Sequence, residues 1–329
     1  MAELILSLID FEEKDLEQLR LVAGERKLVT KMELGGKIPD EIWQQATVIL
    51  GNPTPEQLKM CDHLKLLQLQ SAGADNYCLP GVLPEDVVLC NATGSYGLAI
   101  AEHMVGVTMM MAKKLHLYRD QQFAGVWRDL GAVMPITGSR VLVVGLGDIG
   151  TEYAIRMYML GANITGVTRT VKEGPPFVDR MAVTAQLDEL LPQADIVALA
   201  LPGGNATTGI MNAHRIGLMK PGALLLNVGR GSAIDTDALY QALEEGKLGG
   251  AALDVTDPEP LPIDHPLWHQ PRAVITPHIS GGLHLRDIYD KLVVRCIRNV
   301  AAYAQGRPYE SQVDRSTGYA VTRTSAAES

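Results

Sequence analysis

The sequence predicts an α/β protein with two doubly wound parallel-sheet domains. The chain has 329 residues, more than one hydrophobic core usually organises, so two domains of ordinary size are expected. Short apolar runs alternate with polar, helix-like stretches in both halves of the chain, which is the pattern of parallel α/β units. A glycine-rich turn, Gly145-Leu146-Gly147-Asp148-Ile149-Gly150, directly follows one of those runs, as in domains that bind a dinucleotide.

The first domain is expected to comprise residues 1–96 and 288–329. Its strands are predicted at the short apolar runs Leu4–Ile9, Thr47–Leu50, Leu66–Leu69 and Val87–Leu89. Leu98–Tyr118 is predicted to be one long helix whose apolar, methionine-rich faces exceed what a single solvated helix needs to bury. Two interpretations stay open for this helix: packing against another subunit, or burial within its own chain.

The second domain is expected to comprise residues 97–287. Its strands are predicted at Val141–Val144, Ile164–Thr168, Ile196–Leu201, Ala223–Val228, Ala251–Val255 and Val274–Thr276, and such continuous apolar strands indicate a sheet covered on both faces. The best-marked helix is Thr236–Glu245, with Asp235 as its N-cap and Gly246 as its stop signal. Arg286–Tyr303 is predicted to be an amphipathic helix that leads back to the first domain. The polar tail Gln312–Ser329 is expected to pack weakly.

Composition limits the partners of the protein. A hydrophobic content of 47% with 20% charged residues is typical of a globular chain, and a net charge of −9 argues against a nucleic-acid or anionic-membrane partner. The longest apolar stretch, Leu98–Ala112, is interrupted by charge and is too short to span a bilayer. The sequence contains four cysteines, Cys61, Cys78, Cys90 and Cys296. They are scattered without zinc-like spacing, so no metal site is predicted. They indicate buried thiols in a reducing compartment, and we therefore expect a cytoplasmic protein.

The glycine-rich turn lies between a predicted strand and the helix-compatible stretch Thr151–Leu160. In that setting its glycines permit a tight turn, backbone approach to a pyrophosphate and close helix–strand contact. NAD-binding sites usually place an acid about 20 residues further on, but residues 153–172 contain none. Arg169, between Thr168 and Thr170, instead suits a 2′-phosphate, so NADP(H) is the predicted preference. The alternative is a solvated arginine in a protein that also accepts NAD(H).

Three ionisable residues follow predicted strands downstream of the turn: Arg230, Glu259 and His278. Taken singly, Arg230 is better interpreted as part of a surface ion pair and His278 as a structural histidine, and Glu259 could be an exposed acid. Taken together, the three side chains could bind a substrate and transfer a proton to or from it. The planar fork of Arg230 suits a carboxylate beside a carbonyl, and a glutamate bonded to one ring nitrogen of His278 would fix its tautomer and favour the imidazolium. The other ring nitrogen would then serve as an acid or base.

The chain resembles the D-isomer-specific 2-hydroxyacid dehydrogenase family from Leu4 to about Tyr309. The motifs that carry the resemblance are Ser71-Ala72-Gly73-Ala74-Asp75, the glycine-rich turn, Leu224-Leu225-Leu226-Asn227-Val228-Gly229-Arg230-Gly231, Ala252-Leu253-Asp254-Val255, Asp257-Pro258-Glu259-Pro260, and His265-Pro266-Leu267-Trp268 leading to Thr276-Pro277-His278. The resemblance implies a Rossmann cofactor domain and a flavodoxin-like substrate domain built from both chain ends. It also implies a cleft that closes over the ligand, and a homodimer formed through the cofactor domains and the Leu98–Tyr118 region.

The resemblance also implies a role for each matched residue. Arg230 would orient and polarise a 2-oxo acid, His278 would be the acid/base, and Glu259 would tune it. Backbone amides around Ala72, Gly73 and Ala74 would bind the substrate carboxylate. The cofactor contacts would come from the turn residues Gly145, Gly147, Asp148, Ile149 and Gly150, from Leu201, Pro202 and Val228 lining the cleft, and from Asp254 near the nicotinamide carboxamide.

Two departures from the family pattern stand out. Arg169 replaces the ribose-binding acid, as in the NADPH-using reductases of the family. Asp148 is an acid where basic or neutral residues are more usual, and an acid beside a pyrophosphate would repel it unless its side chain pointed to solvent. The predicted function is reduction of a 2-oxo acid, which in reverse oxidises a D-2-hydroxy acid. The alternatives are a phosphite-type dehydrogenase and a non-catalytic, dinucleotide-sensing protein of corepressor type. Glyoxylate, hydroxypyruvate, branched-chain and aromatic 2-oxo acids all remain open as substrates.

Overall fold

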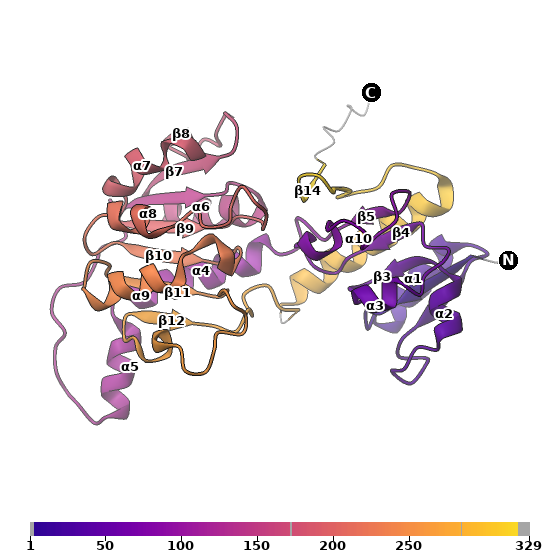
Figure 1. Ribbon diagram of the computed structural model, residues 1–329, viewed down its shortest axis with the longest axis horizontal. Helices are drawn as coiled ribbons and strands as arrows, with labels where there is room; N and C mark the ends of the chain where they lie inside the picture. The colour runs from indigo at the N-terminus through magenta and orange to yellow at the C-terminus, as the bar shows by residue number, and fades with distance from the viewer. Residues whose placement is uncertain (1–2, 172, 284, 322–329) are drawn as a thin grey trace. The chain divides into compact units, whose positions relative to one another are not determined.

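The computed structural model describes residues 3–171, 173–283 and 285–321. The chain divides into two compact units (Figure 1). Unit 1 contains the residues up to Ser95 and those from Leu283 onward, and unit 2 runs from Tyr96 to Gly282. Unit 2 is therefore a continuous stretch of chain inserted into unit 1.

Unit 1 is built on a five-stranded parallel sheet with the order β2-β1-β3-β4-β5. The strands are β1 (Leu4–Ser7), β2 (Lys27–Thr30), β3 (Ala46–Leu50), β4 (Leu66–Gln68) and β5 (Val88–Cys90). The helices of this unit are α1 (Glu13–Ala23), α2 (Asp40–Gln45), α3 (Pro55–Leu58), the short η1 (Asp75–Tyr77) and α10 (Arg286–Gln305). Ile5, Ile49 and Leu67 are fully buried on the central strands. The sequence located four of these strands, and only β2 was missed.

The stretch Gln312–Val321 is better packed than the sequence suggested. A small antiparallel hairpin joins β13 (Val313–Asp314) to β14 (Tyr319–Ala320), and Val313 is buried in the unit 1 core. The Arg315 guanidinium donates hydrogen bonds to the backbone carbonyls of Leu83, Pro84 and Val87. The prediction of weak packing from Gln312 is therefore wrong as far as Val321, and the rest of that predicted tail lies outside the described residues.

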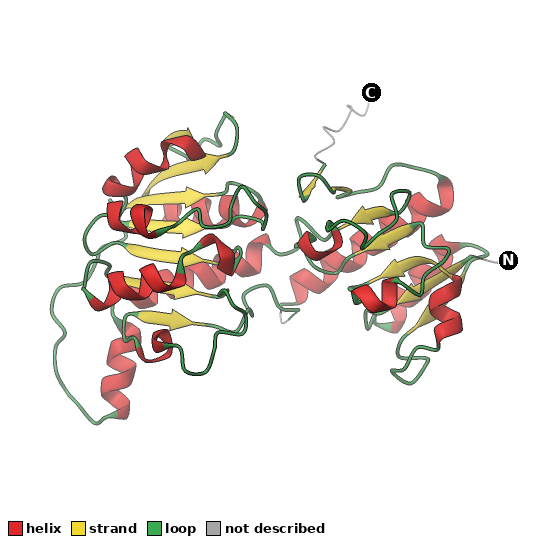
Figure 2. Cartoon of the chain, in the orientation of Figure 1, coloured by secondary structure: helices red, strands yellow, loops and turns green. Residues whose placement is uncertain are grey.

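Unit 2 is built on a seven-stranded parallel sheet with the order β12-β11-β10-β9-β6-β7-β8. The strands are β6 (Arg140–Val144), β7 (Asn163–Thr168), β8 (Arg180–Val183), β9 (Ile196–Leu199), β10 (Leu224–Asn227), β11 (Gly250–Leu253) and β12 (Ala273–Ile275). Figure 2 shows helices on both faces of this sheet, so the predicted doubly wound fold is confirmed. The edge strand β8 was not predicted.

The helices of unit 2 are α4 (Gly97–Ala112), α5 (Leu115–Phe123), α6 (Asp148–Met159), α7 (Leu187–Leu190), α8 (Ala213–Leu218) and α9 (Thr236–Glu244), with short 3-10 turns η2 (Thr184–Gln186), η3 (Leu191–Gln193), η4 (Gly231–Ala233) and η5 (Pro266–His269). The start of α9 is as predicted, because Asp235 accepts a hydrogen bond from the Ala238 amide at 3.0 Å. In the part of the chain that the structure describes, no helix is both long and apolar enough to cross a membrane.

The prediction of one helix over Leu98–Tyr118 is wrong. The backbone breaks after Ala112, where Lys114 adopts a left-handed conformation with φ of 56°, and the chain restarts as α5. The first part, α4, is buried within its own unit, where it packs on α6 and approaches β10 and β11. The second part, α5, has no fully buried residue and lies below β12 in the view of Figure 1. Burial within its own chain therefore applies to α4, and packing of this region against another subunit stays a prediction.

Candidate active site

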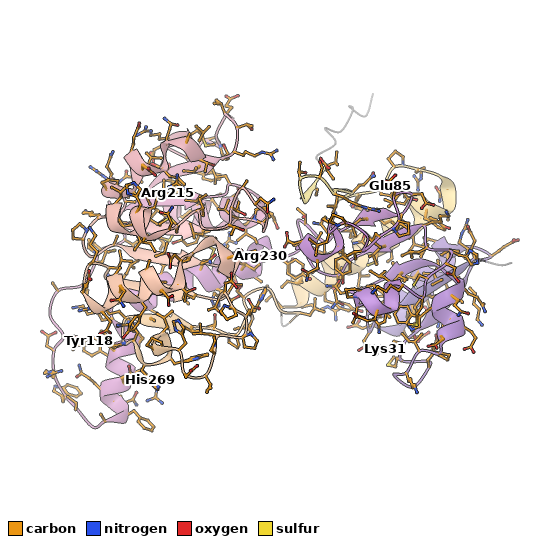
Figure 3. All side chains as sticks on the ribbon, in the orientation of Figure 1. Lys31, Glu85, Tyr118, Arg215, Arg230 and His269 are labelled. Atoms are coloured by element: carbon orange, nitrogen blue, oxygen red, sulfur yellow. The ribbon has the colours of Figure 1, made fainter. Side chains whose placement is uncertain are left out.

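The predicted site residues of unit 2 gather at one edge of its sheet. All its strands are parallel, so their carboxyl ends share that edge, and β6 lies between β7 on one side and β9 on the other. Such a switch point is where open α/β sheets bind ligands. Six of the seven strand ends carry predicted residues: the glycine-rich turn after β6, Thr168 to Thr170 at the end of β7, Leu201 and Pro202 after β9, Val228 to Arg230 after β10, Asp254 and then Glu259 after β11, and His278 after β12. Arg230 is labelled at this edge in Figure 3.

The glycine-rich turn has the geometry expected of a phosphate cradle. A Cβ on Gly150 would lie 1.9 Å from the carbonyl oxygen of Gly145, so close helix–strand contact requires glycine there. A Cβ on Gly147, by contrast, would meet nothing within 4 Å. Gly147 is also the N-cap residue of α6 and provides no side-chain cap. An open helix N-terminus without a side-chain cap fits the pyrophosphate of a dinucleotide, because its amides and the helix dipole favour negative charge.

Arg169 and Thr170 are exposed directly after β7. The neighbouring hydroxyl of Thr168 has an internal partner, because it donates to the carbonyl of Thr170 at 2.7 Å. The loop is therefore closed by a local bond between Thr168 and Thr170, on either side of Arg169. Lys172, a second cationic residue near this strand end in the sequence, lies outside the described residues.

Arg230 is held by a buried asparagine that sequence reasoning did not single out. Asn227 is fully buried, accepts a hydrogen bond from the Gly229 amide at 3.0 Å, and donates to the Arg230 carbonyl at 2.8 Å. Glycines lie on both sides of Arg230, and their close neighbours are protein backbone: added Cβ atoms on Gly229 and Gly231 would lie 2.4 Å from the Leu201 oxygen and 1.9 Å from the Thr256 oxygen. Tight packing of the loop is thus the reason for both glycines.

Glu259 and His278 are in direct contact. The Nδ1 atom of His278 lies 2.6 Å from Oε1 of Glu259, and the two side chains are 51% and 43% exposed. A carboxylate at Nδ1 fixes the tautomer and the ring plane, and it leaves Nε2 as the second functional nitrogen. His278 itself adopts a positive φ of 51°. A non-glycine residue in that region is strained, so the surrounding loop has to hold it there.

Asp254 is the residue that holds this loop. It is 3% exposed, and its own carbonyl accepts a hydrogen bond from the His278 amide at 2.9 Å. One carboxylate oxygen accepts from the Thr276 hydroxyl at 2.5 Å and the Ile279 amide at 3.0 Å. The other accepts from the amide and hydroxyl of Ser280, at 3.0 and 2.5 Å.

This set of donors also explains the charge state of Asp254. Burial by itself raises the pKa of that carboxyl, but the hydrogen bonds from Ser280, Thr276 and the Ile279 amide outweigh burial and hold the pKa below its usual range. Asp254 was singled out as a cofactor contact, whereas its bonds to the His278 loop were not anticipated. A signal was present in the sequence: an acid ending a fully apolar run, and hydroxyl residues on both sides of Pro277-His278-Ile279.

The Ala72–Ala74 loop belongs to unit 1 and follows β4. The Ala72 carbonyl accepts from Asn91 Nδ2 at 2.6 Å, and the Gly73 carbonyl accepts from the Ser71 hydroxyl at 2.7 Å. In a trans peptide the next amide points opposite to the carbonyl. Fixing these carbonyls therefore also fixes the directions of the Gly73 and Ala74 amides. Within the described ranges, no group of three or more histidine, cysteine or acidic side chains is arranged to hold a metal ion.

Comparisons with known proteins agree with this geometry. A family model described as "D-isomer specific 2-hydroxyacid dehydrogenase, NAD binding domain" matches residues 105–280, a stretch that contains the glycine-rich turn, Arg230, Glu259 and His278. A putative 2-hydroxyacid dehydrogenase of Haemophilus influenzae is 33% identical over 266 residues, which cover 76% of this chain and 81% of that protein. A glyoxylate reductase of Thermofilum pendens is 30% identical over 263 residues, which cover 76% of this chain and 75% of that protein.

A solved structure extends the likeness to nearly the whole chain. The crystal structure of a D-isomer specific 2-hydroxyacid dehydrogenase from Xanthobacter autotrophicus Py2, in complex with NADPH and MES, is similar with a TM-score of 0.81 at 26% identity. The similarity covers 97% of this chain and 99% of that chain.

Proposed function

Since the chain belongs to the D-isomer specific 2-hydroxyacid dehydrogenase family and is an oxidoreductase of that family, we propose that it reduces a 2-oxo acid with NADPH. In reverse it would oxidise a D-2-hydroxy acid. The observation that carries the proposal is the 2.6 Å contact between His278 and Glu259, on the sheet edge that also bears the glycine-rich turn and Arg230. An acid/base pair, a carboxylate-binding arginine and a dinucleotide turn are the parts that hydride transfer to a 2-oxo acid requires.

Each residue has a defined task in the proposed reaction. When bound, the nicotinamide supplies the hydride that reaches C2 of the substrate. His278 donates a proton from Nε2 to the oxygen that develops negative charge, while Glu259 holds Nδ1 and stabilises the charged ring. Arg230 binds the substrate carboxylate and polarises the adjacent carbonyl.

The reaction is tested by initial rates of NADPH and NADH oxidation with glyoxylate, hydroxypyruvate, 2-oxoisocaproate and phenylpyruvate. We expect turnover with at least one of these acids, and we expect a His278→Gln variant to lose about 10²- to 10⁴-fold in kcat, the usual contribution of general acid–base catalysis. NADPH binding by the same variant, followed by fluorescence, is the control for intact folding. Undiminished turnover by His278→Gln would refute its role, and absence of turnover with both cofactors would refute the proposed reaction.

We propose NADPH as the preferred cofactor because Arg169 is exposed at the end of β7, where NAD-binding members carry an acid. The NADPH complex of the Xanthobacter protein supports this assignment. An Arg169→Asp variant should bind NADPH more weakly and NADH no more weakly, because the new acid repels a 2′-phosphate and accepts from ribose hydroxyls. Arg180→Asp is the matched control, since Arg180 is exposed at the amino end of β8, the opposite edge of the sheet. Equal ratios of NADPH to NADH affinity in both variants would overturn the assignment.

We further propose that unit 1 is the substrate domain, that unit 2 is the cofactor domain, and that the protein is a cytoplasmic homodimer. The dimer proposal is supported by α5 and the loop after it, which expose Phe123, Val126 and Trp127. Exposed aromatic residues in one stretch are typical of protein interfaces. We expect Trp127→Ser to shift the mass measured by light scattering toward the monomer. Leu21→Ser, on an exposed leucine of α1, should leave the mass unchanged. A monomeric wild-type protein would refute the dimer.

A further inference from the structure

Asp148 lies in the glycine-rich turn, where the sequence suggested that its charge would repel a pyrophosphate unless the side chain pointed to solvent. The structure gives the carboxylate a different environment. Its Oδ2 atom accepts a hydrogen bond from the backbone amide of Gly97 at 2.9 Å. Gly97 is the first residue of α4, far from the turn in sequence but packed against it within the same unit.

The contact is shaped for a carboxylate. A Cβ on Gly97 would lie 2.5 Å from Oδ1, 2.7 Å from Cγ and 2.9 Å from Oδ2 of Asp148, so all three atoms of the carboxyl group lie against the Gly97 backbone. Gly97 is buried. Any side chain at that position would displace the carboxylate from its place.

Asp148 also provides the capping acceptor that is missing from the N-terminus of α4. The N-cap residue of α4 is Tyr96, which makes no side-chain cap. Asp148 therefore acts as the capping acceptor from a different helix, and it is itself the first residue of α6. A carboxylate between two helix N-termini is stabilised by both helix dipoles. The two helices are joined again further along by a buried hydrogen bond between the hydroxyls of Thr108 and Tyr153, 2.9 Å apart.

We propose that Asp148 is a positioning residue that anchors the glycine-rich turn to the first turn of α4 and so orders it for dinucleotide binding. Its charge is compensated at α4 rather than directed at the bound phosphates. The inference rests on the proposed function, because it concerns how the same cofactor site is held.

The test measures the NADPH dissociation constant of the variants Asp148→Asn, Asp148→Ala and Gly97→Ala, with thermal unfolding measured in parallel. Asp148→Asn keeps an acceptor but loses the charge, so we expect NADPH binding to weaken about two- to threefold; repulsion predicts the opposite sign, tighter binding. Asp148→Ala and Gly97→Ala should each weaken binding by about tenfold, the equivalent of one hydrogen bond to a charged group. These substitutions should raise the KM for NADPH and leave kcat unchanged.

The double variant Gly97→Ala with Asp148→Ala provides the decisive comparison. Because the clashing carboxylate is then absent, adding Gly97→Ala to Asp148→Ala should weaken binding by no more than about twofold. Gly106→Ala is the matched control, since Gly106 is exposed on the same helix and a Cβ there would meet nothing within 4 Å; it should leave NADPH binding unchanged.

Two results would overturn the proposal while leaving the proposed function intact: tighter binding by Asp148→Asn, or lower melting temperatures for Asp148→Ala and Gly97→Ala with unaltered NADPH affinity. The second result would assign Asp148 to stability alone. A wild-type protein that binds neither NADPH nor NADH would instead refute the proposed function, and this inference with it.

Discussion

Replacing Asp254 with asparagine is the sharpest test of how the catalytic loop is held. The substitution keeps the shape of the side chain but turns one acceptor oxygen into an NH₂ donor. Each oxygen of Asp254 accepts from one backbone amide and one hydroxyl: Ile279 and Thr276 on one side, both groups of Ser280 on the other. Whichever way the new amide is turned, it faces one backbone N–H. A hydroxyl can rotate to accept from it, but an N–H cannot.

The magnitude follows from these bonds. One buried backbone N–H left without an acceptor costs about 1–3 kcal/mol, and the two bonds that remain lose their charge assistance at roughly 1 kcal/mol each. The positive φ of His278 costs a further strain energy of order 1–3 kcal/mol, which is released when the loop leaves this conformation. Even the low end of the first two costs, about 3 kcal/mol, would make the loop occupy the productive geometry roughly a hundredfold less often, since about 1.4 kcal/mol corresponds to a factor of ten. We therefore expect kcat/KM to fall by about a hundredfold.

The assay is steady-state turnover of the best 2-oxo acid, with chemical unfolding as a second measurement. Asp235→Asn is the control, because Asp235 caps α9 through a single amide bond and asparagine caps a helix equally well. A kcat/KM and an unfolding free energy equal to those of the control would refute the reasoning.

The Asp254→Asn variant also tests how the unfolding free energy depends on pH. The pKa of Asp254 is lowered on folding, so the stability it contributes is present above its ordinary value of 3.8 and is lost as the pH falls through the lower folded value. The difference in unfolding free energy between wild type and Asp254→Asn should therefore stay constant from about pH 5 to pH 8 and shrink only in stronger acid. A difference that shrinks as the pH falls from 7 to 5 would contradict the assignment of a lowered pKa.

Three further outcomes can be measured. Glu259→Gln keeps a hydrogen-bonding side chain but removes the charge, and kcat should fall by about tenfold to a hundredfold with NADPH binding retained; an unaltered kcat would show that the charge of Glu259 is not used. Gly150→Ala places a Cβ 1.9 Å from the Gly145 oxygen, so it should abolish dinucleotide binding and lower the melting temperature, and normal binding would show that the turn can rearrange. Burial raises the pKa of the Cys90 and Cys296 thiols to about 12, so at pH 8 both should react with a thiol reagent only after denaturant is added, and fast labelling of the native protein would contradict this.

The sequence predicted the structure best where local backbone geometry requires one type of residue. The strand, turn and helix around Gly145–Gly150 could be predicted because close backbone contact demands glycine, and the start of α9 could be predicted because Asp235 is a strong N-cap. The edge strands β2 and β8 were missed because each begins with a long cationic residue, Lys27 and Arg180, and an edge position relaxes the apolar pattern. The break after α4 was missed because Lys113-Lys114 carries no glycine or proline.

The site shows the same division between local and long-range information. Arg230, Glu259 and His278 could be singled out as chemical types at strand ends, and the contact of Glu259 with His278 then depends on strand order. The role of Asn227 could not be predicted, because it works through hydrogen bonds to a loop whose path only the fold determines. For Asp254 the hydroxyl residues around Pro277-His278-Ile279 were a signal, but its partners also depend on the path of that loop. Asp148 was expected either to repel phosphate or to face solvent, since nothing in the nearby sequence indicates that Gly97 would lie against it.

The insertion of unit 2 into unit 1 constrains the order in which the newly synthesised chain can fold. Unit 2 is complete once Gly282 has left the ribosome, but unit 1 waits for α10, which packs against α1. Tyr289 on α10 donates to Asp15 across a separation of 274 residues, and Asn299 donates to Gln68 across 231. Until those last segments emerge, the apolar face of α1 and its sheet lack their covering helix. The part of unit 1 that precedes unit 2 is therefore covered by α10 only after the whole of unit 2 has been synthesised.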